Sequence, residues 1–417
     1  MSGPTRQALD RSYELATPGT RAGPGAGREG GAGAALDLSA PLDRDAVVAL
    51  AVTRSPALAV LSHRARALVH AGRAEGTPPP AELGLQASNL PLARPYAAGE
   101  ADMYLLELRQ RFPPGAALDA RARAMAEEAQ ALLAEVSSEE RLVAERAGAA
   151  FADYSQALAE RRLAERQLAL LHRMGQAVQA RYPTGGSSLS DGARVELELA
   201  RGRRALARAE GTILRSRATL NVVLRRPAAA PLGEPRDVPV ETVALGVDEL
   251  VARAEATRGA TVSADARVRA ATARREAAAA EARIPEVMVG FGYWQDPAMR
   301  PGLGVSASMS LPWLWGPTGH RLDQAREEEA AERAARDQAG LEARTEVVEV
   351  HAQLRAIEAQ LAVVRARALP AARRSLDALA AAYTTGSATL LDWVDVTRSV
   401  LDLELEAVEL RGDLERG

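Results

Sequence analysis

The chain has 417 residues, of which 26% are charged, and its formal net charge is −3. A balance this close to neutrality lacks the basic excess typical of nucleic-acid-binding proteins, so we expect no nucleic-acid partner. Cysteine is absent, which excludes disulfides, thiolate metal sites and a lipid-modified N-terminal cysteine in the numbered chain.

The N-terminal segment, residues 1–41, is rich in glycine and proline, with pairs such as Pro18-Gly19 and Gly30-Gly31. This composition buries too little apolar surface to offset the entropy of an unfolded chain. The sequence therefore predicts a disordered segment over residues 1–41. The segment also lacks the basic start and the apolar run of about 7 to 15 residues that form a secretory signal, so no export signal is visible in this chain.

The remainder of the chain carries an internal repeat. Leu118-Asp119 returns as Leu322-Asp323 after 204 residues, and Tyr182-x-x-Gly185 returns as Tyr383-x-x-Gly386 after 201. Landmarks that keep their order and spacing indicate two copies of one large unit. We predict a first repeat over residues 42–232 and a second over residues 233–417, folded as intertwined halves.

Within the first repeat, we predict two β-strands, at about 83–90 and 103–112. In the second of these, Leu106 and Leu108 flank Glu107. Alternation of apolar and polar side chains is the pattern of a strand with one face of each kind. We therefore expect a β-hairpin at this point of the repeat.

Two long helices are predicted to follow, at about 118–182 and 188–226. No proline lies between Pro114 and Pro183, and the stretch is rich in strong helix formers such as Ala, Arg, Glu and Leu. A helix over 118–182 would be roughly 100 Å long, far beyond an ordinary globular helix. Such a helix needs a packing partner along its whole length.

The second repeat also contains two predicted strands, at about 286–295 and 303–311. The second alternates strictly over nine residues, the length with which a tilted strand crosses a bilayer. We expect one face to meet lipid and the other to meet a lumen. The expected lipid-facing residues are Val305, Ala307 and Met309, and the expected lumen-facing residues are Ser306 and Ser308.

The last two predicted helices span about 318–382 and 388–415. In the first of them, apolar residues recur at alternating spacings of three and four, which is the pattern of a left-handed coiled coil. The series is Val347, Val350, Leu354, Ile357, Leu361, Val364 and Ala368. A cytosolic coiled coil or helical bundle fits these segments equally well, so the helices alone do not decide the function.

Aromatic residues gather in and beside the predicted strands. They are Tyr96, Tyr104, Phe112, Phe291, Tyr293, Trp294, Trp313 and Trp315. Aromatic girdles mark the membrane interfaces of outer-membrane barrels, although aromatic packing in a soluble β core is the alternative. Because even the smallest transmembrane barrels need about eight strands, four strands per chain require an oligomer to complete one.

Two β-hairpins, each flanked by very long helices and related by a repeat, resemble the TolC family of outer-membrane efflux proteins. The resemblance extends over nearly all of residues 42–410. Its local marks are the run Arg54-Ser55-Pro56-Ala57-Leu58, similar to the family's frequent NPAL motif, and Tyr383-x-x-Gly386 before the last helix. Prolines at the strand–helix junctions add to it: Pro80, Pro113, Pro285 and Pro312.

The resemblance implies a mainly α fold with a small transmembrane β part. Duplicated coiled-coil helices would form an α-barrel, and two β-hairpins would contribute four strands to a trimeric 12-stranded β-barrel. The implied function is the outer-membrane channel of a tripartite efflux or type I secretion system, with its helical part in the periplasm. The implied partners are two further copies of the chain, a periplasmic adaptor (membrane fusion) protein, an inner-membrane pump and outer-membrane lipid. The exported cargo would be small molecules, metal ions or proteins, selected mainly by the pump.

The segment Gly386 to Asp395 resembles the family segment that carries paired aspartates at the periplasmic entrance. Asp392 and Asp395 are therefore the predicted pore-entrance residues. Their i,i+3 spacing places them on one helical face, and threefold symmetry could bring six carboxylates around a narrow axis. The alternative is that the two aspartates are ordinary solvated residues on a helix surface.

Tyr383 resembles a gate residue of the family, and Asp191 resembles its partner from the first repeat. A tyrosine hydroxyl that donates to a carboxylate on a neighbouring helix could hold the end of a helical tube closed. Some relatives have an arginine in this latch, where Ala388 stands in this chain. The sequence therefore predicts an incomplete form of the latch.

The sequence contains no sign of catalysis. Its five histidines are scattered without the spacing of metal ligands, and its serines lie in no nucleophile-elbow or hydrolase motif. We expect no catalytic residue, no metal site, no cofactor and no enzymatic activity. The alternative to a channel is a structural coiled-coil scaffold derived from the same fold.

Overall fold

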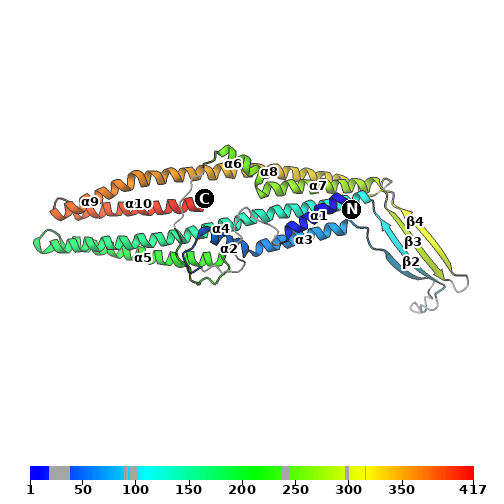
Figure 1. Cartoon of the computed structure of the whole chain (residues 1–417), viewed down its shortest axis with the longest axis horizontal. Helices are drawn as coiled ribbons and strands as arrows, with labels where there is room; N and C mark the ends of the chain where they lie inside the picture. Colours follow the sequence, from blue (N-terminus) through cyan, green and yellow to red (C-terminus); the bar gives the residue numbers. More distant parts are fainter. Residues whose placement is uncertain are drawn as a thin grey trace. The chain divides into compact units, whose positions relative to one another are not determined.

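A computed structural model describes residues 1–17, 38–88, 101–236, 244–295, 300–314 and 316–417, with residues 90 and 93. The described chain is mainly helical and contains one four-stranded sheet (Figure 1). This confirms the expected fold class of long helices with a small β part. Two of the aromatic residues noted above, Tyr96 and Trp315, lie outside the described residues.

The chain begins with a helix, α1 (Gly3–Ala16), so the prediction of disorder from residue 1 onward is wrong for this segment. The Ser2 side chain caps it by accepting a hydrogen bond from the Thr5 N–H, and Leu9 is fully buried. Residues 5–16 contain neither glycine nor proline, and a composition averaged over 1–41 conceals this. The glycine- and proline-rich residues 18–37 lie outside the described residues.

The helices of the first half follow the proline positions closely. They are α2 (Arg44–Thr53), α3 (Pro56–Glu75), α4 (Gly115–Arg181) and α5 (Leu189–Val223). α4 has 67 residues, begins directly after Pro114 and ends shortly before Pro183. Its length of roughly 100 Å agrees with the sequence estimate.

The helices of the second half include a break within the predicted helix 318–382, so the prediction of one continuous helix there is wrong. These helices are α6 (Val247–Thr257), α7 (Gly259–Arg283), α8 (Thr318–Val363), α9 (Leu369–Thr385) and α10 (Leu390–Arg416). A π-helical turn at Val364–Ala368 separates α8 from α9, directly before Pro370. Because Pro370 has no N–H to donate to the preceding turn, the regular hydrogen-bond ladder is interrupted there.

Within the part of the chain that the structure describes, no single helix is long and apolar enough to span a bilayer, and only α2 and α3 taken together meet that criterion.

The sheet joins the two hairpins in the antiparallel order β1-β2-β3-β4. Its strands are β1 (Glu82–Ser88), β2 (Met103–Phe112), β3 (Val287–Gln295) and β4 (Gly302–Met309). The two hairpins pair through β2 and β3, where Leu108 lies opposite Phe291. β1 and β4 are therefore the two edge strands, each with one side unpaired among the described residues.

The two faces of the sheet differ sharply in chemistry. In the observed register Val305 lies opposite Phe291 and Ala307 lies opposite Val289, whereas Ser306 lies opposite Gly290. One face is therefore apolar, and it carries Leu83, Leu85, Tyr104, Leu106, Leu108, Phe112, Val287, Val289, Phe291, Tyr293, Leu303, Val305, Ala307 and Met309. The other face carries mostly charged, hydroxyl and glycine residues. The predicted separation of Val305, Ala307 and Met309 from Ser306 and Ser308 is present in the register.

The chain forms two compact units, and each takes segments from both sequence halves. The first contains α1, α3, the sheet, α7 and the N-terminal parts of α4 and α8, and the second contains α2, α5, α9, α10 and the C-terminal parts of α4 and α8. The repeat boundaries at 42–232 and 233–417 describe the sequence and remain predictions.

In the first unit, α4 and α7 are linked by ion pairs, and both helices carry buried alanines. Arg123 pairs with Glu276 at 2.8 Å, and Arg269 pairs with Glu127 at 2.8 Å. Buried alanines include Ala120, Ala124 and Ala131 of α4 and Ala266, Ala270, Ala271, Ala273 and Ala277 of α7, whereas Ala126 and Ala129 of α4 pack with Leu9 of α1 and Val69 of α3. Small side chains at a helix contact allow the two helix axes to approach closely.

Candidate functional site

Each sequence half contains one helix hairpin, and both turns are built in the same way. α4 leads into α5 through Gly185, at φ 72°, and α9 leads into α10 through Gly386, at φ 85°. Both values lie in the left-handed region that a residue with a Cβ rarely adopts, which explains the glycine at each position. The two turns lie at the same end of the second unit (Figure 1).

The helix after each turn begins with a capping box. Ser188 and Asp191 bind each other's backbone N–H groups at the start of α5, and Thr389 and Asp392 do so at the start of α10. This satisfies helix N–H groups that would otherwise lack partners. Asp191 and Asp392 therefore occupy the same position in the two repeats. The Ser/Thr-x-x-Asp spacing is the sequence signal that identifies Ser188 and Thr389 as their partners.

Asp392 and Asp395 are both exposed on the first turns of α10. Asp392 Oδ2 accepts hydrogen bonds from Thr389 Oγ1 at 2.6 Å and from Thr389 N at 3.2 Å, and these bonds lower the pKa of Asp392. Asp395 Oδ1 lies 3.6 Å from Arg398 Nη1. The two carboxylates share one side of the helix, as their spacing predicts, and their place at a pore entrance stays a prediction.

Tyr383 is buried in the core between the two hairpins of the second unit, with 3% of its surface exposed. Its ring lies 5.2 Å from that of Trp393, and the Arg181 guanidinium lies 4.8 Å from the Tyr383 ring centroid. Arg181 also donates a hydrogen bond to the Tyr383 carbonyl oxygen. Burial raises the pKa of Tyr383, and the positive charge of Arg181 opposes the increase only in part.

The hydrogen bond expected between Tyr383 and Asp191 is not formed within this chain. Asp191 Oδ2 instead accepts from Ser188 N and Ser188 Oγ, each at 2.8 Å. The Tyr383 hydroxyl has no hydrogen-bond partner among the described residues. The capping box thus occupies the carboxylate, and ring packing rather than the hydroxyl fixes the tyrosine. Arg181, which the sequence analysis did not identify, connects the two turns.

A second connection between the hairpins is an ion cluster around the buried Glu198 of α5. Glu198 Oε1 accepts from Arg398 Nη2 of α10 at 2.5 Å and from Arg201 Nη1 at 2.7 Å. Burial raises the pKa of Glu198, but the hydrogen bond and charge of Arg398, with those of Arg201, outweigh burial and lower it overall. Neither residue type nor spacing in the sequence singles out this cluster.

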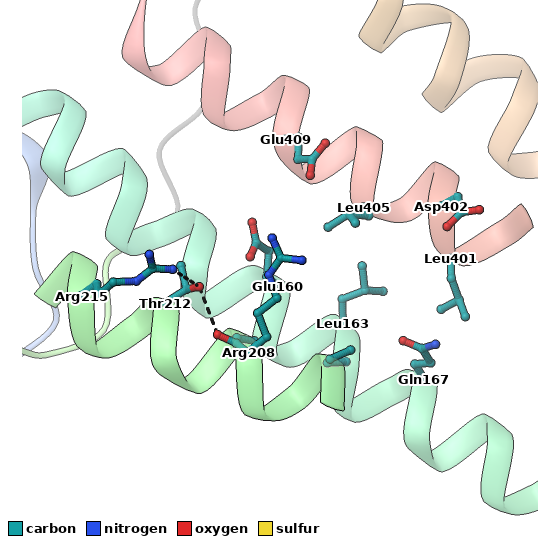
Figure 2. Close-up of a pocket in the computed structure, with 13 residues that line it drawn as sticks. Glu160, Leu163, Gln167, Arg208, Thr212, Arg215, Leu401, Asp402, Leu405 and Glu409 are labelled. Carbon is teal, nitrogen blue, oxygen red and sulfur yellow. Dashed lines mark hydrogen bonds between the residues drawn. The ribbon is translucent and has the colours of Figure 1, made fainter. Parts of the chain in front are cut away.

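Farther along the same helices, a cavity of about 450 Å³ lies between α4, α5 and α10 (Figure 2). Leu401 and Leu405 project from α10 toward Leu163 of α4. The polar lining has both signs of charge: Glu160, Arg208, Arg215, Asp402 and Glu409. Among the residues that the structure describes, no group of three or more His, Asp or Glu side chains could hold a metal ion.

The fold is that of outer-membrane channels, as comparison with solved structures shows. The outer-membrane channel OprN matches with a TM-score of 0.74 and 19% identity, over 93% of this chain and 94% of that chain. VceC of Vibrio cholerae matches with a TM-score of 0.74 and 19% identity, over 89% and 93%. CusC matches with a TM-score of 0.76 and 16% identity, over 91% of each chain.

Residues 250–416 match the family described as "Outer membrane efflux protein". The resemblance to TolC-type efflux proteins is thereby confirmed. No curated protein sequence matches the chain. The similar structures are channels rather than enzymes.

Proposed function

We propose that the protein is the outer-membrane channel of a tripartite efflux or type I secretion system. The observation that carries the proposal is the sheet, whose apolar face is extensively exposed. Leu83, Leu303 and Val305 have 72%, 83% and 71% of their surface exposed. A monomeric soluble protein rarely leaves so large a contiguous apolar surface in water, whereas contact with lipid satisfies it.

The proposed assembly is a homotrimer. Among the described residues, the outer sides of the edge strands β1 and β4 have no strand partner, and each unpaired backbone N–H or C=O group costs several kcal/mol in lipid. Pairing β1 of one copy with β4 of the next removes both edges, and three copies supply the twelve strands that the family resemblance implies. The helical part would lie in the periplasm, where an adaptor protein and an inner-membrane pump would engage it.

In this assembly Asp392 and Asp395 would ring the periplasmic entrance, and Tyr383, Arg181 and Asp191 would lie at the gate. The support is that both hairpin turns lie at one end of the second unit and that Asp392 and Asp395 are exposed there. The buried Tyr383–Arg181 contact would tie one turn to the other. Cargo selection would rest mainly with the pump.

The test is to purify the full-length protein from membranes and to measure its mass in detergent, its fractionation and its conductance in planar bilayers. A trimer that fractionates with the outer membrane and conducts ions supports the proposal. A folded protein that stays monomeric, with protected β segments and no conductance, contradicts it. A stable trimer without conductance would favour a structural scaffold.

A further inference from the structure

One large aromatic residue lies on the polar face of the sheet. Trp294 lies opposite Leu105 on β2 and Gly302 on β4, in the same face as Glu107 and Ser306. Its neighbours in sequence, Tyr293 on one side and Gln295 on the other, belong to the apolar face. Trp294 therefore cannot be part of an aromatic girdle that faces lipid.

The indole ring rests on strand positions that have no side chains. A methyl group added at Gly302 would lie 2.5 Å from the Trp294 ring, and one added at Gly304 would lie closer still. Gly292, which lies opposite Gly304, is covered by the Leu105 side chain, whose Cδ1 is 3.2 Å from the point that a Cβ on Gly292 would occupy. Glycine at these positions thus allows Trp294 to lie against the sheet, beside Leu105.

The Trp294 ring remains partly open to solvent. Trp294 has 38% of its surface exposed although it packs on Gly302 and Gly304. On the same face of the sheet, the charge of Glu107 is compensated by Arg109 at 2.7 Å. A solute would therefore be held here by stacking on the ring and by apolar contact, with little help from net charge.

We propose that Trp294, with Leu105, is a binding platform for planar aromatic solutes on the inner wall of the channel. The proposal rests on the proposed function, since the polar face lines a lumen only if the sheet closes into a barrel. Three copies would place three platforms around the lumen. Each would slow aromatic solutes by stacking while leaving small ions unhindered.

The test uses the full-length protein in planar bilayers, with ethidium as a planar aromatic cation and spermidine as a cation without a ring. Trp294→Ala should weaken ethidium block about tenfold, as expected for loss of one aromatic stacking contact, and Trp294→Phe should weaken it less. Spermidine block should stay unchanged in both variants. Equal ethidium block in the wild type and in a conducting Trp294→Ala trimer would overturn the platform and leave the channel proposal intact.

A matched pair of glycine variants tests the geometry. Gly304→Ala should displace the indole and change ethidium block, because the added methyl group overlaps the ring. Gly84→Ala adds the same methyl group to the same face of β1, where its nearest neighbour is the Glu107 carbonyl oxygen at 3.8 Å, and should change nothing. Equal effects of the two variants would contradict the inference.

A second measurement does not need conductance. Ethidium should quench tryptophan fluorescence of the detergent-solubilised protein more strongly in the wild type than in Trp294→Phe. Quenching that is equal in the two proteins would overturn the platform even if no channel current were found. Absence of current together with a Trp294-dependent difference in quenching would count against the proposed function and support the platform.

Discussion

The two faces of β4 allow a paired test of how the sheet meets the membrane. Ala307 lies on the apolar face opposite Val289, and Ser306 lies on the polar face opposite Gly290. We expect Ala307→Arg to destabilise the assembled protein because the guanidinium would enter lipid. We expect Ser306→Arg to be tolerated because its side chain would enter water.

The position of Ala307 along the strand sets the size of the effect. β4 spans Gly302–Met309, so Ala307 lies about two residues from the centre of the strand. At about 3.4 Å per residue and a tilt near 45°, this is roughly 5 Å from the midplane. Arginine costs about 2 to 4 kcal/mol at the midplane and less toward the interfaces, so we expect about 2 kcal/mol for Ala307→Arg. Val305→Arg, nearer the centre, should cost more.

The assay is denaturant unfolding of the trimer reconstituted in lipid vesicles, followed by gel mobility and intrinsic fluorescence. A loss of about 2 kcal/mol corresponds to a roughly thirtyfold change in the unfolding equilibrium. Ser306→Arg is the matched control, because it adds the same side chain one residue away. Unchanged stability for Ala307→Arg together with disruption by Ser306→Arg would reverse the assignment of the faces.

Three further predictions concern the hairpin end of the second unit. Replacing both Asp392 and Asp395 with asparagine should lower the cation preference of the channel and weaken its block by multivalent cations from the periplasmic side. If the assembled double variant keeps wild-type selectivity, the two aspartates are ordinary solvated residues. Tyr383→Phe should leave channel closure and stability nearly unchanged, because the Tyr383 hydroxyl has no hydrogen-bond partner among the described residues. Arg181→Ala should raise the open probability in single-channel recordings, because it removes the contact of Arg181 with the Tyr383 ring. An open channel in Tyr383→Phe would restore a role for the hydroxyl. Glu198→Gln should lower the unfolding free energy by about 1 to 3 kcal/mol at neutral pH. The pKa of Glu198 is lower in the folded state than in the unfolded state. The extra stability of the wild type over Glu198→Gln is therefore present above the unfolded-state pKa and should vanish as the pH falls through the folded-state pKa. Unfolding free energies of both proteins measured against pH would detect this loss.

The elements were largely predictable from local sequence rules. Proline exclusion located both ends of α4, and alternation located β4 to within two residues of its observed end at Met309. Both rules act on the backbone or on one strand, so they need no knowledge of partners. The helix α1 was missed because a glycine-rich average concealed a short helix-forming run.

The connections between elements were not predictable in the same way. Nothing local indicates that β2 pairs with β3, or that Glu198 meets Arg398, because both depend on segments about 200 residues apart in sequence. The burial of Tyr383 is of the same kind. Its equivalent Tyr182 also lies three residues before a left-handed glycine, yet 56% of its surface is exposed.

The duplicated turns also bear on why one chain carries both halves. If a half-length chain assembled six times, every turn would be identical, and a change that suited a buried turn would be imposed on an exposed one. Joining two copies in one gene would lower the symmetry of such an assembly from sixfold to threefold. Tyr383 can then become an interior anchor with Trp393 beside it, while at the matching positions Tyr182 is exposed and Gly192 is half-buried. In the proposed trimer, fusion would let six similar turns evolve as two independent sets of three.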